Sequence, residues 1–202
     1  MNEPVFVAGT GIISAIGYTV AECLDALENG RAGMNRMQYL DSVHKQRLPV
    51  AEVKLSNDEL AKLGNLTNIK SRTALLSLIA AKEALTNAGI ENIKSLRCGF
   101  VSANSVGGMD KTENFFKNFL THNNKGKLRN IINHECGSVT ELVADALGIK
   151  DYITTISTAC SSSANSIFFG ARLIRNNIVD LVVAGGTDSL TKFTLNGFNT
   201  LM

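Results

Sequence analysis

The sequence has 202 residues, of which 45% are hydrophobic and 19% are charged, and it contains 17 glycines and 2 prolines. This composition is typical of a globular protein and excludes a disordered or collagen-like chain. The balance of 20 basic against 18 acidic residues leaves a net charge of +2, which argues against a nucleic-acid-binding protein. A chain of this length buries about 70% of the surface of its extended form, which is enough for a hydrophobic core.

The cysteines are far apart and form no C-x-x-C pair; they are Cys23, Cys98, Cys136 and Cys160. This spacing argues against a metal site or a disulfide framework and favours reduced thiols. Two uncharged stretches, 4–21 and 152–171, are the places where a membrane segment would lie. The first lacks the basic flank of a signal peptide, and the second is rich in Ser and Thr. We therefore predict a cytoplasmic protein without a membrane span, and expect no cofactor and no metal.

The first predicted element is a short buried strand, Val5–Gly9, which runs into a glycine-rich turn. Thr19 and Glu22 then have the spacing of a capping box, in which each side chain accepts a hydrogen bond from a free backbone N–H at the start of a helix. This helix is predicted to end near Gly30. The stretch from about 33 to 56 has no clear period, which predicts loops with short strands.

Two clear patterns lie in the middle of the chain. Residues 71–88 carry an apolar stripe at helical spacing and are followed by Gly89, which can take the left-handed conformation that ends a helix. Cys98–Ala103 has the composition of a second buried strand, which ends before Gly107. Beyond it, Asp110 opens another predicted helix.

The next region is more polar. Residues 121–130 are polar and basic, which predicts an excursion on the surface. Ser138 and Glu141 have the spacing of a second capping box, at the start of a helix that is predicted to end at Gly148.

The last third of the sequence has the pattern of a β-α-β unit. A β-branched strand, Tyr152–Ser157, is followed by a helix over 160–175 and by a strand, Leu181–Ala184, that ends at a pair of glycines. Strands that alternate with helices predict an α/β fold with a largely parallel sheet. No repeat or linker divides the chain, so residues 1–202 are predicted to form one domain.

The candidate catalytic residue is Cys160, because it lies where a buried strand becomes a helix. Backbone N–H groups at the start of a helix are unpaired and carry partial positive charge. They favour a thiolate over a thiol and can hold an oxyanion. Ser161 and the two serines after it are small enough to let a long substrate approach. The alternative is a buried, inert cysteine.

Two longer strings surround this junction: Ile156-Ser157-Thr158-Ala159-Cys160-Ser161-Ser162-Ser163 and Asp180-Leu181-Val182-Val183-Ala184-Gly185-Gly186. They resemble the active-site segment of the β-ketoacyl synthases, above all β-ketoacyl-acyl-carrier-protein synthase II, and the Cys-Ser-Ser-Ser form is also similar to that of polyketide ketosynthases. Further matching segments, in the order of the family, are Val7–Gly11, Gly17 and Ser105–Gly108. The resemblance covers essentially the whole chain. It implies a thiolase-like fold, with a layered α-β-α arrangement and a mostly parallel mixed sheet.

The resemblance implies that Cys160 is the nucleophile that takes an acyl group from the thioester of an acyl carrier protein, and that its backbone N–H is an oxyanion donor. The acyl-enzyme would then react with the carbanion formed by decarboxylation of malonyl-acyl carrier protein, which gives a longer 3-oxoacyl chain and carbon dioxide. A thiol suits this work because it exchanges readily with thioesters. Val106 matches a family position that lines the acyl pocket near its gate; ordinary core packing is its alternative role.

The sequence also departs from the family, whose members consist of two similar halves. The resemblance covers the first half only, so the chain is predicted to be a truncated N-terminal β-ketoacyl synthase domain. The histidines that the family uses for decarboxylation belong to the second half. The histidines present here, His44, His122 and His134, match no such motif and are predicted to be structural or surface residues. We therefore expect the isolated chain to be inactive in condensation.

Three alternatives stay open. A polyketide or specialised-lipid ketosynthase shares the chemistry but differs in substrate. A non-catalytic partner subunit, similar to chain-length factors, would typically lack Cys160. A nucleotide-dependent oxidoreductase is suggested by Gly9 and Gly11, which nearly form a G-x-G-x-x-G turn after a strand, but Ser14 replaces the third small residue.

The resemblance also implies partners. Acyl carrier protein is acidic in the systems resembled, so a basic docking rim is one role for Lys117, Lys125, Lys127 and Arg129. A solvated loop is the alternative. Family members are homodimers in which a strand beside the cysteine pairs across the two-fold axis. Residues 152–157 match that strand, and their β-branched sequence suits a central strand.

Overall fold

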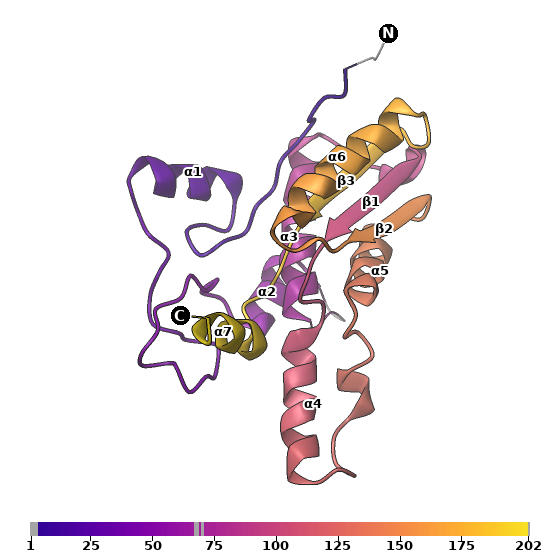
Figure 1. Cartoon of the computed structure of the whole chain (residues 1–202). Coiled ribbons are helices and arrows are strands. Elements are labelled where there is room, and N and C mark those ends of the chain that lie inside the picture. The colour runs from indigo at the N-terminus through magenta and orange to yellow at the C-terminus, as the bar shows by residue number, and fades with distance from the viewer. Residues whose placement is uncertain (1–3, 67–68, 70, 202) are drawn as a thin grey trace.

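The computed structural model describes residues 4–66, 69 and 71–201, and a parallel sheet of three strands lies at its centre (Figure 1). The strands are β1 (Cys98–Ala103), β2 (Tyr152–Ile156) and β3 (Leu181–Gly186). Their spatial order is β2-β1-β3, so β1 is central and the other two are edges.

Helices cover both faces of this sheet. The helices of the described residues are α1 (Val20–Glu28), α2 (Asn57–Leu63), α3 (Arg72–Asn87), α4 (Met109–Thr121), α5 (Cys136–Leu147), α6 (Ser162–Arg175) and α7 (Lys192–Asn199), with short 3₁₀ turns η1 (Ile93–Ser95), η2 (Leu128–Asn130) and η3 (Ala159–Ser161). α6 packs on one face, and α3 and α5 pack on the other (Figure 1). The predicted α-β-α layering is confirmed. In the described part of the chain, no helix combines the length and the apolar character that a membrane crossing needs.

The core follows from the alternation of side chains along β1. Phe100 packs with Leu78 of α3 and Val143 of α5, whereas Val101 packs with Leu173 of α6. Successive side chains of a strand point to opposite faces of a sheet, so one central strand contributes to both hydrophobic layers. All of β1 is buried, which explains its continuous apolar sequence.

The strongest sequence patterns give the elements that they predict. The helix predicted over 71–88 is α3, and Gly89 after it has a φ of +68°. The strand predicted at Cys98–Ala103 is β1. The β-α-β pattern of the last third corresponds to β2, α6 and β3.

The predicted strand Val5–Gly9 is wrong. Residues 4–13 form no regular structure, and Phe6 and Val7 are 81% and 79% exposed. Side chains of α3 hold the segment instead, since Asn87 Nδ2 donates to the Thr10 carbonyl at 2.7 Å and the Ile12 N–H donates to Glu83 Oε2 at 2.8 Å. A cleft of about 430 Å³ separates the segment from the free edge of β3. The backbone groups that would hydrogen-bond to a neighbouring strand therefore bond to side chains of α3 or face solvent.

The second capping box is also wrong. α5 begins at Cys136 after Glu135, and no side chain caps it, so Ser138 lies inside the helix. The S-x-x-E spacing occurs inside helices as well as at their starts, and the packing of Val139 against the sheet sets the start earlier. The helix ends at Gly148, as predicted, and Gly148 takes the left-handed conformation.

The first capping box is half formed. Thr19 accepts a hydrogen bond from the Glu22 N–H, but the Glu22 carboxylate accepts from the Tyr18 N–H rather than from Thr19. A complete capping box, between Ser56 and Glu59, begins α2, a helix that was not predicted.

Replacing Gly11 by alanine is expected to lower the free energy of unfolding by about 1–3 kcal/mol, the usual cost of overpacking. An added Cβ would lie 2.0 Å from the Ala80 carbonyl oxygen and 2.7 Å from the Ala84 nitrogen, both in the backbone of α3. Gly137→Ala is the matched control, because a Cβ there meets nothing within 4 Å. Urea unfolding measures both, and a Gly11→Ala protein as stable as the control would contradict this packing.

Candidate active site

The carboxyl ends of the three strands bring together segments that are far apart in the sequence. The turn 104–108 follows β1, Ser157–Ser161 follows β2 and residues 187–191 follow β3. Hydrogen bonds join them: the Asn104 N–H donates to the Ile156 carbonyl at 3.3 Å, and the Thr187 N–H donates to the Ala103 carbonyl at 2.9 Å. In parallel α/β sheets this edge is where ligands bind.

Cys160 lies at this edge, in η3 between β2 and α6. The predicted position between a strand and a helix is confirmed. The thiol is exposed, whereas Cys23 and Cys98 are buried and Cys136 is half-buried. The residue before it, Ala159, has a φ of +52°, in a region that residues with a Cβ rarely adopt. Such backbone strain is typical of turns that hold a functional side chain in place.

Hydroxyl groups hold this turn. Ser162 Oγ accepts from the Thr158 N–H and donates to the Ala159 carbonyl, both at 2.7 Å. The Ser161 hydroxyl donates to the Thr158 carbonyl at 2.8 Å. The Ser161 side chain is exposed, but its hydroxyl group is hydrogen-bonded within the turn. Among the residues that the structure describes, no hydrogen-bond acceptor meets the Cys160 N–H, which leaves this donor available for a ligand.

The start of α6 also lies against the end of β3. A Cβ added to Gly186 would lie 1.9 Å from Ser163 Oγ and 3.3 Å from the Ala103 Cβ. Glycine at this position therefore leaves room for the helix that follows Cys160 to approach the sheet.

An apolar pocket of about 360 Å³ opens at the same end of the sheet. Its wall on one side is the turn after β1, and its other wall is α7; the lining includes Val106, Met109, Phe193, Gly197, Phe198 and Leu201. Val106 therefore lies at a pocket, and its role at the gate of an acyl pocket, which the family resemblance implies, stays a prediction. Cys160 and Ser161 do not line this pocket.

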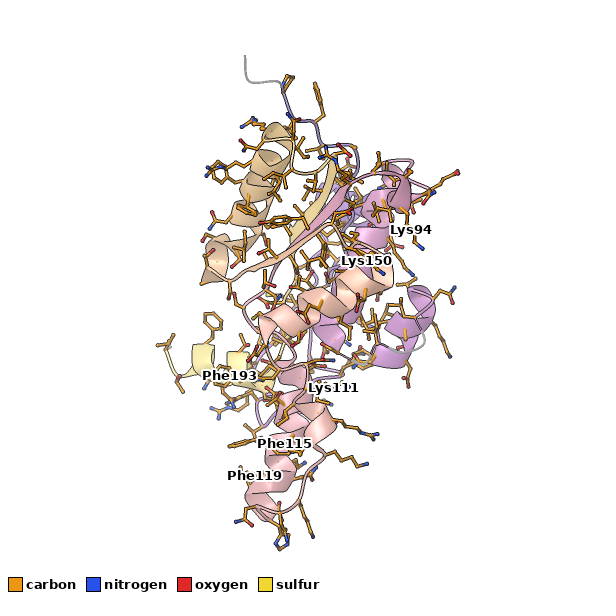
Figure 2. All side chains as sticks on the ribbon, turned by 90° about the vertical axis from the view of Figure 1, so that its right-hand side faces the viewer. Lys94, Lys111, Phe115, Phe119, Lys150 and Phe193 are labelled. Carbon is orange, nitrogen blue, oxygen red and sulfur yellow. The ribbon has the colours of Figure 1, made fainter. Side chains whose placement is uncertain are left out.

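α7 is anchored to α4, so the pocket has two fixed walls. Thr191 caps α7 by accepting from the Thr194 N–H, and Glu113 Oε1 of α4 accepts from the Phe193 N–H at 2.7 Å. Figure 2 shows Phe193 beside α4, which carries Phe115 and Phe119 with their rings stacked. Two other apolar side chains of α4, Phe116 at 54% and Leu120 at 70% exposure, face outward.

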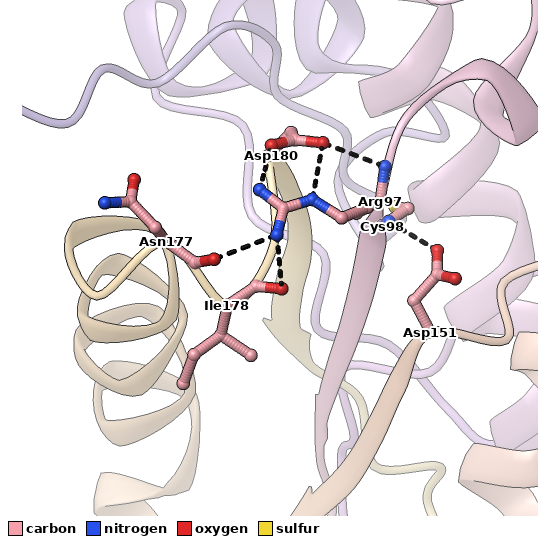
Figure 3. Close-up of polar contacts among 6 residues, drawn as sticks. All are labelled: Arg97, Cys98, Asp151, Asn177, Ile178 and Asp180. Atoms are coloured by element: carbon pink, nitrogen blue, oxygen red, sulfur yellow. Dashed lines mark hydrogen bonds and ion pairs between the residues drawn. The ribbon is translucent and has the colours of Figure 1, made fainter.

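At the opposite end of the sheet, where the strands begin, a cluster of polar residues links them by hydrogen bonds (Figure 3). Arg97 pairs with Asp180 through Nη2 at 2.5 Å, and the Asp151 carboxylate accepts from the Cys98 N–H at 2.8 Å. Burial, and secondarily the negative charge of Asp151, raises the pKa of the Cys98 thiol to about 11. Burial also raises the pKa of Cys136. This cluster joins β1, β2 and β3 at their starts.

Cys160 is expected to react first with iodoacetamide at about pH 8, because it is exposed, and Cys98 is expected to stay unmodified, because only a thiolate reacts and its raised pKa keeps it protonated. Mass spectrometry of peptides from a time course gives the order. Equal rates at Cys98 and Cys160 would contradict it.

The pKa of Cys98 in the folded chain is about 11, above its ordinary value of 9.0. The folded state therefore keeps the thiol neutral at pH values where the unfolded chain ionises it. The contribution of Cys98 to the free energy of unfolding is fully present below pH 9.0 and is lost as the pH rises to about 11.

The histidines lie outside the Cys160 turn. His134 is exposed, and its Nδ1 lies 2.9 Å from Thr112 Oγ1 of α4. His122 is exposed just after α4, and His44 is half-buried in the loop before α2. The basic side chains predicted as a docking rim are exposed at the end of α4 and in the loop after it; they are Lys117, Lys125, Lys127 and Arg129.

Solved structures share this architecture. The ishigamide ketosynthase/chain length factor superposes with a TM-score of 0.85 at 20% sequence identity, covering 96% of this chain and 50% of that chain. A type II PKS acyl-carrier protein in complex with its ketosynthase bound to the hexaketide (AntDE:AntF) gives a TM-score of 0.80 at 19% identity, covering 100% of this chain and 49% of that chain. The fold is therefore the thiolase-like fold of ketosynthases.

Sequence comparison narrows this class to a family. Residues 2–202 match the family Beta-ketoacyl synthase, N-terminal domain, and the chain belongs to it. The 3-oxoacyl-[acyl-carrier-protein] synthase 2 of Coxiella burnetii is 25% identical over 96% of this chain and 48% of its own length. The ketoacyl synthase alpha subunit of the tetracenomycin polyketide synthase of Streptomyces glaucescens is 23% identical, over 93% and 46%. The chain thus spans about half the length of these relatives.

Sequence reasoning missed parts of this site. α7 was not predicted, although Thr191 stands at its start as a capping residue and apolar residues follow. Asp188 was not singled out, although its carboxylate accepts backbone N–H groups of the turn after β1. Only the approach of β3 to β1 in the fold makes this contact visible.

Proposed function

We propose that this chain is the acyl-accepting half of a 3-oxoacyl-[acyl-carrier-protein] synthase of fatty acid biosynthesis, with Cys160 as the nucleophile. The observation that carries the proposal is the exposed thiol on a strained turn at the end of β2, whose own backbone N–H has no acceptor among the described residues. Membership of the Beta-ketoacyl synthase family supports it.

The proposed step is transfer of an acyl group between two sulfur atoms. The Cys160 thiolate attacks the carbonyl carbon of an acyl-carrier thioester, and a new C–S bond forms while the carbonyl oxygen becomes an oxyanion. The Cys160 N–H donates to this oxyanion. Collapse of the intermediate breaks the carrier's C–S bond, and the carrier thiolate leaves and takes up the proton that Cys160 has lost. The acyl group is then bound as a thioester to Cys160.

The apolar pocket between the turn 104–108 and α7 would hold the acyl tail. Its lining is almost entirely hydrocarbon and aromatic, which suits an alkyl chain and excludes charged substrates. Val106 would contact the tail from one wall, and Ser161 would border the thioester beside Cys160. The carbonyl would lie at the turn and the tail would extend toward α7.

Condensation is proposed only for the whole enzyme. It needs a carbanion from malonyl-acyl carrier protein, and the groups that the family uses for decarboxylation are not matched by His44, His122 or His134. The isolated chain is therefore expected to accept an acyl group without forming a 3-oxoacyl product.

A polyketide or specialised-lipid ketosynthase is the second candidate, because a relative of similar identity is a polyketide ketoacyl synthase subunit. A non-catalytic partner of the chain-length-factor kind is the third, and the presence of Cys160 argues against it. The length of the acyl groups accepted separates the first two, and acyl transfer itself excludes the third.

Partners follow from the same proposal. The acyl carrier protein would approach the exposed basic residues at the end of α4. A second copy of the chain would pair through residues 152–157, since no strand of the described residues covers the outer edge of β2 and Ile153 is 38% exposed. The four unpaired cysteines support a cytoplasmic, reducing compartment.

Incubation of the chain with octanoyl-acyl carrier protein tests the proposal. The intact mass is expected to rise by one octanoyl group, and neutral hydroxylamine is expected to remove it, because thioesters are cleaved under these conditions and amides are not. Absence of a mass increase, or a label that resists hydroxylamine, would overturn the assignment.

A further inference from the structure

The turn that carries Val106 is fixed along its whole length. Asp188 Oδ1 accepts from the N–H groups of Ser105 and Val106, both at 2.9 Å, and Asp188 Oδ2 accepts from Ser105 at 3.1 Å. One carboxylate therefore binds two successive backbone donors. Such charge-assisted bonds are shorter and stronger than those of a neutral acceptor.

The other half of the turn is held from the interior. Asn104 Oδ1 accepts from the Gly107 N–H at 3.2 Å, and the Gly107 carbonyl accepts from Thr73 Oγ1 at 2.9 Å. Asn104 and Thr73 are 2% and 0% exposed. The Gly108 N–H donates to the His134 carbonyl at 3.1 Å. These contacts belong to the core, whereas Asp188 is exposed and holds only the half of the turn that faces the pocket.

In the sequence, Asp188 lies between β3 and α7, and α7 is the wall of the pocket opposite the turn 104–108. Asp188 is the second residue after β3, and α7 begins at Lys192, just beyond Thr191. Its carboxylate therefore joins the start of one wall to the backbone of the other. The salt bridges found among the described residues do not include Asp188, so its carboxylate is not engaged by a lysine or arginine.

We propose that Asp188 is a positioning residue that holds Val106 at the wall of the apolar pocket, and that it thereby sets which acyl chain lengths the pocket accepts. The proposal deepens the proposed function and rests on it for the identity of the ligand. Without the carboxylate, two N–H groups at the pocket wall lose their acceptor, and the Ser105–Val106 peptide is free to turn toward solvent. A long acyl tail, which contacts this wall, is affected, and an acetyl group, which does not reach it, is not.

Three variants separate positioning from folding. Asp188→Ala removes both acceptors. Asp188→Asn keeps the shape, but its amide NH₂ would face a backbone N–H in place of the second oxygen. Asp151→Asn is the matched control, because Asp151 is also an exposed carboxylate that accepts a backbone N–H of β1, at the opposite end of the sheet.

The measurement is the binding of non-reactive amide analogues of acetyl- and octanoyl-pantetheine by calorimetry. We expect Asp188→Ala to weaken octanoyl binding by about tenfold and acetyl binding by less than about twofold, with a smaller effect for Asp188→Asn and none for Asp151→Asn. In a Val106→Ala background, Asp188→Ala is expected to add little, because both changes act on the same contact.

Equal loss for both analogues, no loss for either, or full additivity with Val106→Ala would overturn the inference. The amides cannot acylate Cys160, so this binding test does not depend on acyl transfer. A chain that binds octanoyl analogues selectively but is not acylated would contradict the proposed function and leave the role of Asp188 intact.

Discussion

Replacing Cys160 by alanine is expected to abolish transfer of an acyl group to the chain, with a fall in rate of at least about a thousandfold. The exposed thiol at the strand–helix junction is the nucleophile of the proposed step, and alanine has no atom that can form the new bond. The measurement is the rate at which octanoyl-acyl carrier protein adds one octanoyl mass to the protein.

The matched control is Cys136→Ala. Cys136 is half-buried, and burial raises the pKa of its thiol, so it is expected to remain protonated and to contribute nothing. Cys136→Ala should therefore be acylated at the rate of the unmodified chain. Equal labelling of Cys160→Ala and the unmodified chain would show that another group accepts the acyl chain.

Replacing Gly197 by leucine is expected to slow octanoyl transfer by at least about tenfold and to leave acetyl transfer within about twofold, because the new side chain fills the space that a long tail needs. Gly197 lies on α7 and lines the apolar pocket, and a Cβ there meets nothing within 4 Å. The Cβ of the new side chain therefore meets no neighbour, and the rest of the leucine is expected to occupy pocket space. The loss of a glycine from the helix is also expected to stabilise the fold by about 0.5–1 kcal/mol.

Gly137→Leu provides the comparison for this variant. Gly137 lies on α5, its added Cβ also meets open space, and it does not line the pocket. Transfer of both acyl groups should be unchanged in Gly137→Leu. If Gly197→Leu slowed acetyl and octanoyl transfer to the same extent, the pocket between the turn 104–108 and α7 would not be the site of the tail.

The parts of the fold that the sequence predicts are those where local signals agree with tertiary packing. β1 is a continuous apolar run because it is buried on both faces, and α3 has both a stripe and a glycine stop. Val5–Gly9 has the composition of a strand, yet its partners are Asn87 and Glu83 of α3, which no local pattern reveals. Gly9 and Gly11 lie so close to the backbone of that helix that a Cβ would clash with it. This packing accounts for the two glycines without a phosphate-binding turn.

In the candidate site, too, some features follow from the local sequence and others depend on contacts between distant segments. The position of Cys160 follows from the order of strand, turn and helix, which is local in sequence. The pocket is not local, since its walls come from the turn after β1 and from α7 after β3. The same holds for Asp188, whose carboxylate accepts from two N–H groups that are 82 and 83 positions away in the sequence. Contacts of that range depend on the register of the sheet.

The central claim is that Cys160 carries the acyl group, and localising the label by tandem mass spectrometry tests it most directly. The chain is incubated with octanoyl-acyl carrier protein, digested at acidic pH to preserve thioesters, and every peptide is sequenced. The octanoyl mass is predicted on the sulfur of Cys160. Its presence on Cys136, Ser161 or a lysine, with Cys160 unmodified, would contradict the account.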